Sequence, residues 1–385
     1  MSDFKVDTAV YLDIIRASIT ELNGIMDVSV KDRAKDLVKS AMGRSVRSKD
    51  PLFWPAGMLM LGLVEARRTL LESLSDEEKS QELVAEIDAA ILKHLGFWKH
   101  KNGSKIEYID DALAGTALIR LYQQSYDEAL RQLCKDAIDK ILDYLMKAPR
   151  DFSGTIVYNA ERDGTNVFAD GIGQVSMFLS AYGSSFDNEE ALKLARLQLL
   201  NFKKYGMDDR SGLPYHGYAL SKDYCEKKGV LSWGRAAGWL IMGLSEYSSV
   251  MRQRSSENNW DEDEEPEISE KDELLEWYES LSENLVSYQR PDGGYGWQIQ
   301  AREGHLDTSA TGMIVYGLMN GLGDVDDLEM KEALESSFKT MSINIQEGKV
   351  TDALSSCDDF GVHYQTYGHY PWGQGAVLAA LTWCW

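Results

Sequence analysis

The feature that most constrains the fold is a segment that occurs six times along the chain. Each copy starts with an aromatic or acidic residue, has a glycine or alanine within a few positions, and continues as a nearly unbroken apolar run. Successive copies start 55 to 75 residues apart, which is room for two helices and two loops per unit. The sequence therefore predicts six helical hairpins, with recurrent segments that start at Trp54, Ile109, Phe168, Leu231, Leu306 and Tyr370.

The polar head of each copy is typical of the first turn of a helix. Pro55 and Pro371 stand where a first turn tolerates proline. Ser232 and the aspartates of the heads can cap free backbone N–H groups. We therefore expect a helix to begin at each head.

The segments between the copies have a different pattern. Residues Asp127 to Lys147 form a charged helix with one apolar stripe, made of Leu130, Leu133, Cys134, Ala137, Ile138, Ile141, Leu142 and Leu145. The recurrent segments are instead apolar nearly all round and rich in Gly and Ala, as expected of helices enclosed on every side. The pattern predicts an inner ring of six helices within an outer ring of six.

In such a ring the inner helices run roughly parallel, so their six N-termini gather at one end. Helix N-termini carry partial positive charge and free N–H groups. This end of the molecule is therefore where we expect function, and it suits an anionic ligand.

Composition indicates one globular domain over residues 1–385, because a repeat that closes on itself forms a single unit. Much of the net charge of −22 is local to an acidic insertion at about 255–273, in the longest interval between copies. The overall negative charge disfavours nucleic acid as a partner, because phosphate binding needs clustered Lys and Arg.

No apolar run reaches membrane-spanning length, and the N-terminal residues lack the basic head and apolar core of a signal peptide. The chain as given therefore reads as cytoplasmic, with no membrane partner. Its four cysteines are widely spaced, and we expect them to be free thiols: Cys134, Cys225, Cys357 and Cys384.

The candidate catalytic and binding residues lie at the helix heads and in one loop. They are Asp110, Asp111, Asp170, His216, Trp233, Arg235 and Trp239. Carboxylates for acid and base work, together with flat rings on which a sugar can stack, are the components of a carbohydrate site. The pattern thus favours a sugar-processing enzyme.

Each of these residues also has a structural interpretation. One of Asp110 and Asp111 is expected to be an N-cap, and Asp170 is as compatible with capping as with catalysis. The tryptophans can belong to the core. Arg235 needs an anionic partner, either a protein carboxylate or a ligand, because a guanidinium is costly to bury alone.

Taken in order, the motifs resemble the unsaturated glucuronyl and rhamnogalacturonyl hydrolases of glycoside hydrolase families 88 and 105. The resemblance runs from about Trp54 to the C-terminus and rests on the segments 169–171, 212–216, 233–239 and 306–310. It implies an (α/α)6 barrel, which agrees with the six repeats. It also implies a substrate with a C4=C5 double bond in its terminal uronic acid, as polysaccharide lyases produce.

The resemblance assigns roles to individual residues. Asp170 matches the acid and base aspartate that protonates C4 before water adds at C5, and Asp110 matches a second important aspartate, with Asp111 as the alternative. Trp54 matches an aromatic residue near the entrance. His216, Trp233, Arg235 and Trp239 match positions around the unsaturated sugar. The resemblance implies no cofactor, no metal and no obligate protein partner.

Two residues depart from the family pattern at positions expected to line the site. Gln174 replaces a bulky apolar residue, and Phe168 stands where Trp is frequent. The segment that begins at Asp170 favours the rhamnogalacturonyl branch, while unsaturated units from ulvan or glycosaminoglycans remain open. A sugar epimerase, a conventional inverting glycosidase and an inactive sugar-binding protein also remain as alternatives on the same barrel.

The helix N-terminus lowers the pKa of a carboxyl group, whereas a proton donor near neutral pH needs a raised pKa. Burial and a second carboxylate must therefore act on Asp170, and Asp110 is the natural candidate. We expect a pH optimum on the acidic side of neutral. We also expect loss of Arg235 to weaken substrate binding mainly, and loss of Asp170 to remove turnover.

Overall fold

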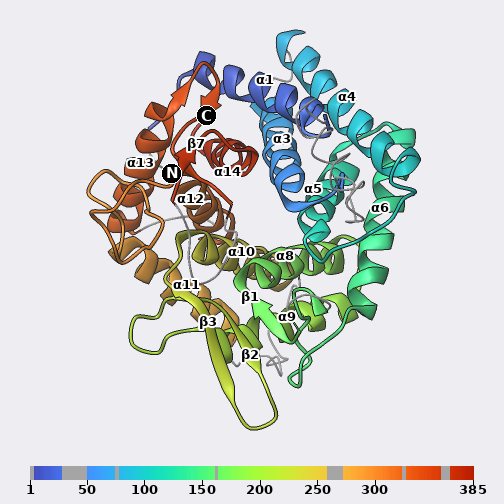
Figure 1. Ribbon diagram of the computed structural model, residues 1–385. Coiled ribbons are helices and arrows are strands. Elements are labelled where there is room, and N and C mark those ends of the chain that lie inside the picture. Colours follow the sequence, from blue (N-terminus) through green and yellow to red (C-terminus); the bar gives the residue numbers. More distant parts are fainter. Residues whose placement is uncertain are drawn as a thin grey trace, which may run out of the picture.

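The computed structural model describes residues 4–27, 50–73, 78–160, 164–257, 272–322, 327–356 and 365–385. Most of these residues are helical, in two sets that alternate along the chain (Figure 1). The inner helices are α3 (Trp54–Ser73), α5 (Asp111–Gln124), α8 (Ala169–Ser185), α10 (Gly234–Glu257), α12 (Thr308–Leu322) and α14 (Pro371–Leu381). The outer helices are α1 (Thr8–Gly24), α4 (Glu78–His100), α6 (Glu128–Lys147), α9 (Glu189–Gly206), α11 (Glu273–Ser287) and α13 (Leu328–Ile343).

The inner helices form a closed ring. Each packs against the next in chain order, and α14 packs against α3 to complete the circle. The six predicted heads all lie at or next to the start of an inner helix. The (α/α)6 barrel expected from the repeats is therefore confirmed.

The difference between the two rings follows from their side chains. Nearly every residue of α8, α12 and α14 is buried. In α6 the buried residues are the predicted stripe, except for Leu142, which is only partly buried. Burial on all sides or on one face thus separates inner from outer helices.

Glycine allows the inner helices to approach closely. A Cβ atom added to Gly173 of α8 would collide with the carbonyl group of Trp239 in α10. Such contacts bring the backbones of neighbouring inner helices together, which explains the Gly-rich composition of the recurrent segments.

The outer ring is completed from the other end of the chain. Helix α1 packs against both α14 and α4, beside the last inner helix. The N–H group of Val6 donates to the carbonyl of Cys384 at 2.9 Å, and the ring of Tyr11 stacks on Trp385 with centroids 4.5 Å apart. The two ends of the described chain therefore meet (Figure 1).

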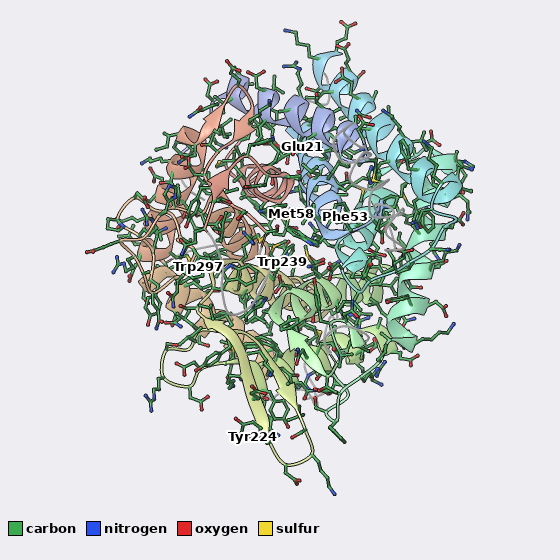
Figure 2. All side chains as sticks on the ribbon, in the orientation of Figure 1. Glu21, Phe53, Met58, Tyr224, Trp239 and Trp297 are labelled. Atoms are coloured by element: carbon green, nitrogen blue, oxygen red, sulfur yellow. The ribbon has the colours of Figure 1, made fainter. Side chains whose placement is uncertain are left out.

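Short strands connect the helices and were not anticipated from the sequence. β1 (Asn166–Phe168), β2 (Tyr215–Leu220) and β3 (Cys225–Leu231) form an antiparallel sheet in that order. The hairpin of β2 and β3 projects from the barrel, with the exposed Tyr224 near its tip (Figure 2). Two smaller antiparallel pairs are β4 (Ile345–Gln346) with β5 (Lys349–Val350), and β6 (Ala353–Leu354) with β7 (Tyr367–Gly368).

Local expectations at the helix starts meet with mixed outcomes. The first-turn positions of Pro55 and Pro371 are confirmed. The capping role of Ser232 is wrong, because this residue lies two positions before α10 with a positive φ of 62°, and its hydroxyl group donates to the side chain of Gln300 at 3.4 Å.

Several other sequence expectations fall partly outside the described residues. Of the acidic insertion, residues 255–257 end α10 and residue 273 begins α11, while 258–271 lie outside. Cys134, Cys225 and Cys384 are free thiols, and Cys357 also lies outside the described ranges. None of the described helices combines the length and the apolar character that crossing a bilayer requires.

Candidate active site

A carboxylate and an imidazole meet at the start of α8. Asp170 is the second residue of this helix, and its Oδ2 lies 3.2 Å from Nε2 of His216 on β2. The pairing of β1 with β2 places the two side chains together, because β1 leads directly into α8. Asp170 forms no N-cap, since the N-cap position is Phe168.

A second carboxylate lies at the neighbouring helix start. Asp110 occupies the N-cap position of α5 but forms no capping hydrogen bond. Its Oδ2 instead accepts a hydrogen bond of 2.7 Å from the hydroxyl group of Tyr158. Within the described residues its buried Oδ1 has no hydrogen-bond partner. An unsatisfied carboxyl oxygen at the end of the barrel is a group held ready for a ligand or a proton.

The electrostatic surroundings favour the protonated form of Asp110. Burial raises its pKa to about 7 against the opposing effect of the Tyr158 hydrogen bond, and the negative charges of Asp170 and Asp50 add to the rise. Near neutral pH a substantial fraction of Asp110 is therefore protonated.

Asp111, the alternative second aspartate, faces different partners. It is fully buried, and its Oδ2 accepts a hydrogen bond of 3.1 Å from the N–H group of Glu107. Burial raises its pKa well above the usual range, and the charge of Asp50 adds to the rise. Of the two neighbours, Asp110 is the one that interacts with Asp170 and Tyr158.

Aromatic rings lie next to the aspartates at this end of the barrel. Phe168 packs on Tyr158 and on His216, with centroid distances of 5.3 and 5.2 Å. His216 in turn lies 4.3 Å from the ring of Trp233. Trp233 is nearly buried, and its indole N–H has no hydrogen-bond partner among the described residues.

Arg235 is engaged by the protein. Its guanidinium group donates to the carbonyl groups of Leu354 and Ser355, each at 2.9 Å, and lies 3.8 Å from Oδ2 of Asp307. It also lies over the ring of Trp233, 4.9 Å from the centroid. Arg235 thus fastens the segment around β6 to the start of α10, and the protein carboxylate anticipated as one of its two options is Asp307.

Three tryptophans from α3, α10 and α14 form a second aromatic group. Trp54 packs on Trp372 at 4.9 Å and edge-on against Trp239 at 6.2 Å. Trp239 lies near the centre of the ring of helices in Figure 2 and is almost fully buried, whereas Trp54 is only partly buried. Trp54 is therefore the more accessible of the two predicted residues.

Gln174 lies one turn after Asp170 on α8. Its side chain is buried, and its Oε1 has no hydrogen-bond partner among the described residues. In the described part of the chain, no three His, Cys, Asp or Glu side chains converge as a metal ion would require.

The model of Glycosyl Hydrolase Family 88 matches residues 29–384. The chain belongs to this family. No protein among the curated sequences matches it.

Solved structures with the same fold share little sequence with the family 88 chain. A possible member of family 105 from Klebsiella pneumoniae has a TM-score of 0.72 and 16% identity, over 98% of this chain and 93% of that one. A similar protein from Salmonella enterica serovar Paratyphi A has a TM-score of 0.70 and 16% identity, over 96% and 92%. An unsaturated glucuronyl hydrolase from Bacillus sp. GL1, described as responsible for the degradation of glycosaminoglycan, has a TM-score of 0.62 and 17% identity, over 95% and 96%.

The sequence did not indicate several residues of this candidate site. Tyr158 lies in a loop without a helical or strand pattern, so nothing marked it as a partner of Asp110. Asp307 and Trp372 lie in the helix heads that start at Leu306 and Tyr370, but nothing in the sequence distinguished them from other head residues. Asp50 stands four positions before Trp54. An acidic residue just before the first helix head is a sequence feature by which Asp50 could have been identified.

Proposed function

We propose that this glycoside hydrolase hydrates the C4=C5 double bond of an unsaturated uronic acid at the non-reducing end of lyase-generated oligosaccharides. The observation that carries the proposal is the Asp110 and Asp170 pair at adjacent helix starts, with the pKa of Asp110 raised to about 7 by burial. Vinyl ether hydration needs a proton donor that is still protonated near neutral pH. Membership of family 88 supports the same reaction.

In the proposed reaction the proton for C4 is drawn from the Asp110 and Asp170 pair. Asp170 is the group that transfers it to the sugar, as the family resemblance implies. Water adds at C5 and returns a proton to the pair, so the pair ends the cycle as it began. The hemiketal at C5 then opens to a ketone, and the hemiacetal left at C1 releases the neighbouring sugar.

The other residues of the candidate site have supporting roles in this proposal. His216 holds Asp170 in place through the 3.2 Å contact. Trp54, which is only partly buried, offers a ring face to the sugars, and Trp233 supports the site through its contacts with His216 and Arg235. The free N–H groups at the inner helix starts favour the carboxylate of the substrate, in a molecule whose net charge of −22 opposes it at long range.

Rhamnogalacturonan fragments are the substrate that we propose first. The segment that begins at Asp170 resembles that of the rhamnogalacturonyl branch. Phe168 and Gln174, the two residues that depart from the family pattern, lie within four positions of this aspartate in the sequence. Fragments of ulvan and chondroitin are the comparison substrates, because they carry the same unsaturated uronate on different sugars.

The test is the ultraviolet absorbance of the conjugated enol carboxylate, followed for unsaturated disaccharides from rhamnogalacturonan, ulvan and chondroitin. We expect absorbance to fall with the wild type and not with Asp170→Asn. Asp139→Asn, which changes an exposed carboxylate on α6, should behave as the wild type. No loss on any of the three substrates would contradict the proposal and favour an epimerase, a conventional glycosidase or a sugar-binding protein.

Arg235→Ala provides a contrast in the same assay. It removes the anchor of the β6 segment rather than the proton donor, so we expect KM to rise about tenfold or more while kcat changes less. Equal losses of kcat in Arg235→Ala and Asp170→Asn, with KM unchanged in both, would argue against this division of roles.

The epimerase alternative receives less support from the histidines. Of the five histidines in the described part of the chain, only His216 lies within ion-pair distance of Asp110 or Asp170. An epimerase of N-acyl sugars is expected to use two. His363 lies outside the described residues.

A further inference from the structure

Gln174 lies on the side of α8 that faces the barrel axis, one turn below Asp170. Gly173 of this helix lies against α10, Phe178 lies against α5, and Gly183 lies against the outer helix α9. Because each residue turns the helix by about 100°, these three contacts fix the directions of the neighbouring helices around α8. The remaining side lies between α5 and α10 and opposite α9, and it carries both Asp170 and Gln174.

Gln174 lies at the same depth in the barrel as Trp239. A Cβ atom added to Gly173 would collide with the carbonyl group of Trp239, so α8 and α10 touch at this level. Trp239 lies near the centre of the ring of helices (Figure 2). The side chain of Gln174 therefore stands beside the interior of the ring, below the helix starts that carry the candidate site.

The interior of the ring is closed farther down. Arg120 of α5 forms ion pairs with Glu65 of α3 and with Glu246 of α10. Because α8 lies between α5 and α10 in the ring, the second pair crosses the interior in front of α8. Glu246 follows Trp239 by seven residues, so this pair lies about 10 Å below it. A ligand that enters at the helix starts therefore meets Gln174 with its leading end and cannot pass through the barrel.

Gln174 differs in its hydrogen bonds from the other two glutamines that are buried in the described part of the chain. The Oε1 atom of Gln198 accepts a hydrogen bond of 2.8 Å from the N–H group of Ile156, and that of Gln374 accepts one of 2.9 Å from Val350. Gln174 is only 1% exposed, yet its Oε1 has no partner among the described residues. A buried polar atom without a partner costs free energy, so a group supplied by a ligand accounts for its presence.

The chemistry of the proposed substrate identifies that group. The unsaturated uronate is linked to the next sugar through C1, so C4, on the opposite side of the ring, enters first. C4 stands between C3, which carries a hydroxyl group, and C5, which carries the carboxylate. A hydroxyl group both donates and accepts, so it can pair with the amide of Gln174 in either orientation. The carboxylate only accepts and cannot satisfy Oε1.

We propose that Gln174 is a binding residue for the C3 hydroxyl group of the unsaturated uronate, and that this contact places C4 against Asp170. The inference rests on the proposed function and deepens it, because it names the atom of the terminal sugar that the buried amide recognises. The contact involves the terminal sugar alone, whichever sugar follows it.

The experiment measures binding to Asp170→Asn by isothermal titration calorimetry, because this variant is expected to bind the unsaturated disaccharide without consuming it. Addition of Gln174→Met should raise Kd about tenfold. An analogue with hydrogen in place of the C3 hydroxyl should bind about tenfold more weakly than its parent to Asp170→Asn, and equally to the double variant. Addition of Gln132→Met, at an exposed glutamine of α6, is the matched control and should leave Kd unchanged.

Thermal unfolding distinguishes a binding role from a structural one. Gln174→Met replaces an unpaired amide by an apolar side chain of similar length, so the thermal midpoint should not fall. Gln374→Met removes hydrogen bonds that join α14 to α1 and β5, so its midpoint should fall by about 2 °C or more. A fall of this size in Gln174→Met would show that its amide is a structural group and would overturn the inference.

The binding results separate the inference from the proposed function. If the wild type turns over a disaccharide but Gln174→Met leaves Kd unchanged, the inference fails and the proposed function stands. The same holds if loss of the C3 hydroxyl weakens binding equally with and without Gln174. If no disaccharide is turned over by the wild type or bound by Asp170→Asn, the proposed function fails and the inference fails with it.

Discussion

The pKa of Asp110 is set by opposing effects of burial and of individual side chains. Burial and the charges of Asp170 and Asp50 raise the pKa of Asp110, while the hydrogen bond from Tyr158 lowers it by stabilising the carboxylate. The value of about 7 is the balance of these effects. Each contributing side chain can be removed with a single substitution.

Tyr158→Phe removes the one effect among these that lowers the pKa of Asp110. We expect its pKa to rise above 7, so that the protonated form persists to higher pH and the alkaline limb of the rate profile moves upward by about half a unit to one unit. The measurement is the dependence of kcat/KM on pH, from 5 to 9.

The wild type itself should have its optimum on the acidic side of neutral, with activity falling as pH rises through about 7. Tyr126→Phe, which changes a fully exposed tyrosine, is the matched control and should not move the limb. A wild-type rate that still rises above pH 8, or a limb that moves downward in Tyr158→Phe, would contradict this account.

The sequence allowed the ionisable residues to be predicted but not their pairing. Asp110, Asp170 and His216 could be identified because they stand in helix heads or in a motif with a fixed order. Their contacts depend on β1 and β2, strands too short to leave a clear alternating pattern. The sequence predicted that Arg235 has either a protein carboxylate or a ligand as its anionic partner. The structure identifies the carboxylate as Asp307.

At the scale of elements, the inner ring depends on backbone contact between neighbouring helices. The recurrent Gly and Ala residues predicted close packing, but the sequence did not indicate which glycine faces which helix. Gly173 faces the carbonyl of Trp239, so α8 and α10 meet near the level of the candidate site. Stability and site geometry are therefore coupled in these two helices.

Gly173→Ala should destabilise the protein although alanine is the better helix former. The added methyl group must displace α10, at a cost of about 1–3 kcal/mol that exceeds the gain of about 1 kcal/mol in helix propensity. Chemical denaturation with circular dichroism measures the change in the free energy of unfolding.

Gly96→Ala in α4 is the matched control, because a Cβ atom there has no neighbour within 4 Å. This variant should be more stable than the wild type by about 0.5–1 kcal/mol. If the two substitutions have the same sign, backbone contact at Gly173 is not what holds the inner helices together.

At the scale of the whole molecule, six repeats do not correspond to six consecutive hairpins. The helices from α3 to α13 alternate between inner and outer positions, but the last inner helix takes its outer neighbour, α1, from the start of the chain. The repeat predicted both rings. It did not indicate this closure, because residues 8–24 lie before the first recurrent segment.

Tyr11→Ala tests the contribution of the closure to global stability. Tyr11 is fully buried against Trp385, so we expect a loss of about 3–5 kcal/mol in the free energy of unfolding. Tyr126→Ala, at a fully exposed position, should change this value by no more than about 0.5 kcal/mol. A loss below about 1 kcal/mol in Tyr11→Ala would indicate that the ring is stable without the joined ends.

The hydrogen bond between Val6 and Cys384 has a further consequence for how this chain can be encoded. Because the two ends of the described chain lie side by side, a short linker can join them and a new opening can be made in an exposed loop, such as the turn at residues 221–224 between β2 and β3. The resulting circular permutant would begin and end at the projecting hairpin while keeping every helix beside its present neighbours. In a ring of this kind the order of helices in space is fixed, whereas the point at which translation starts is free to vary.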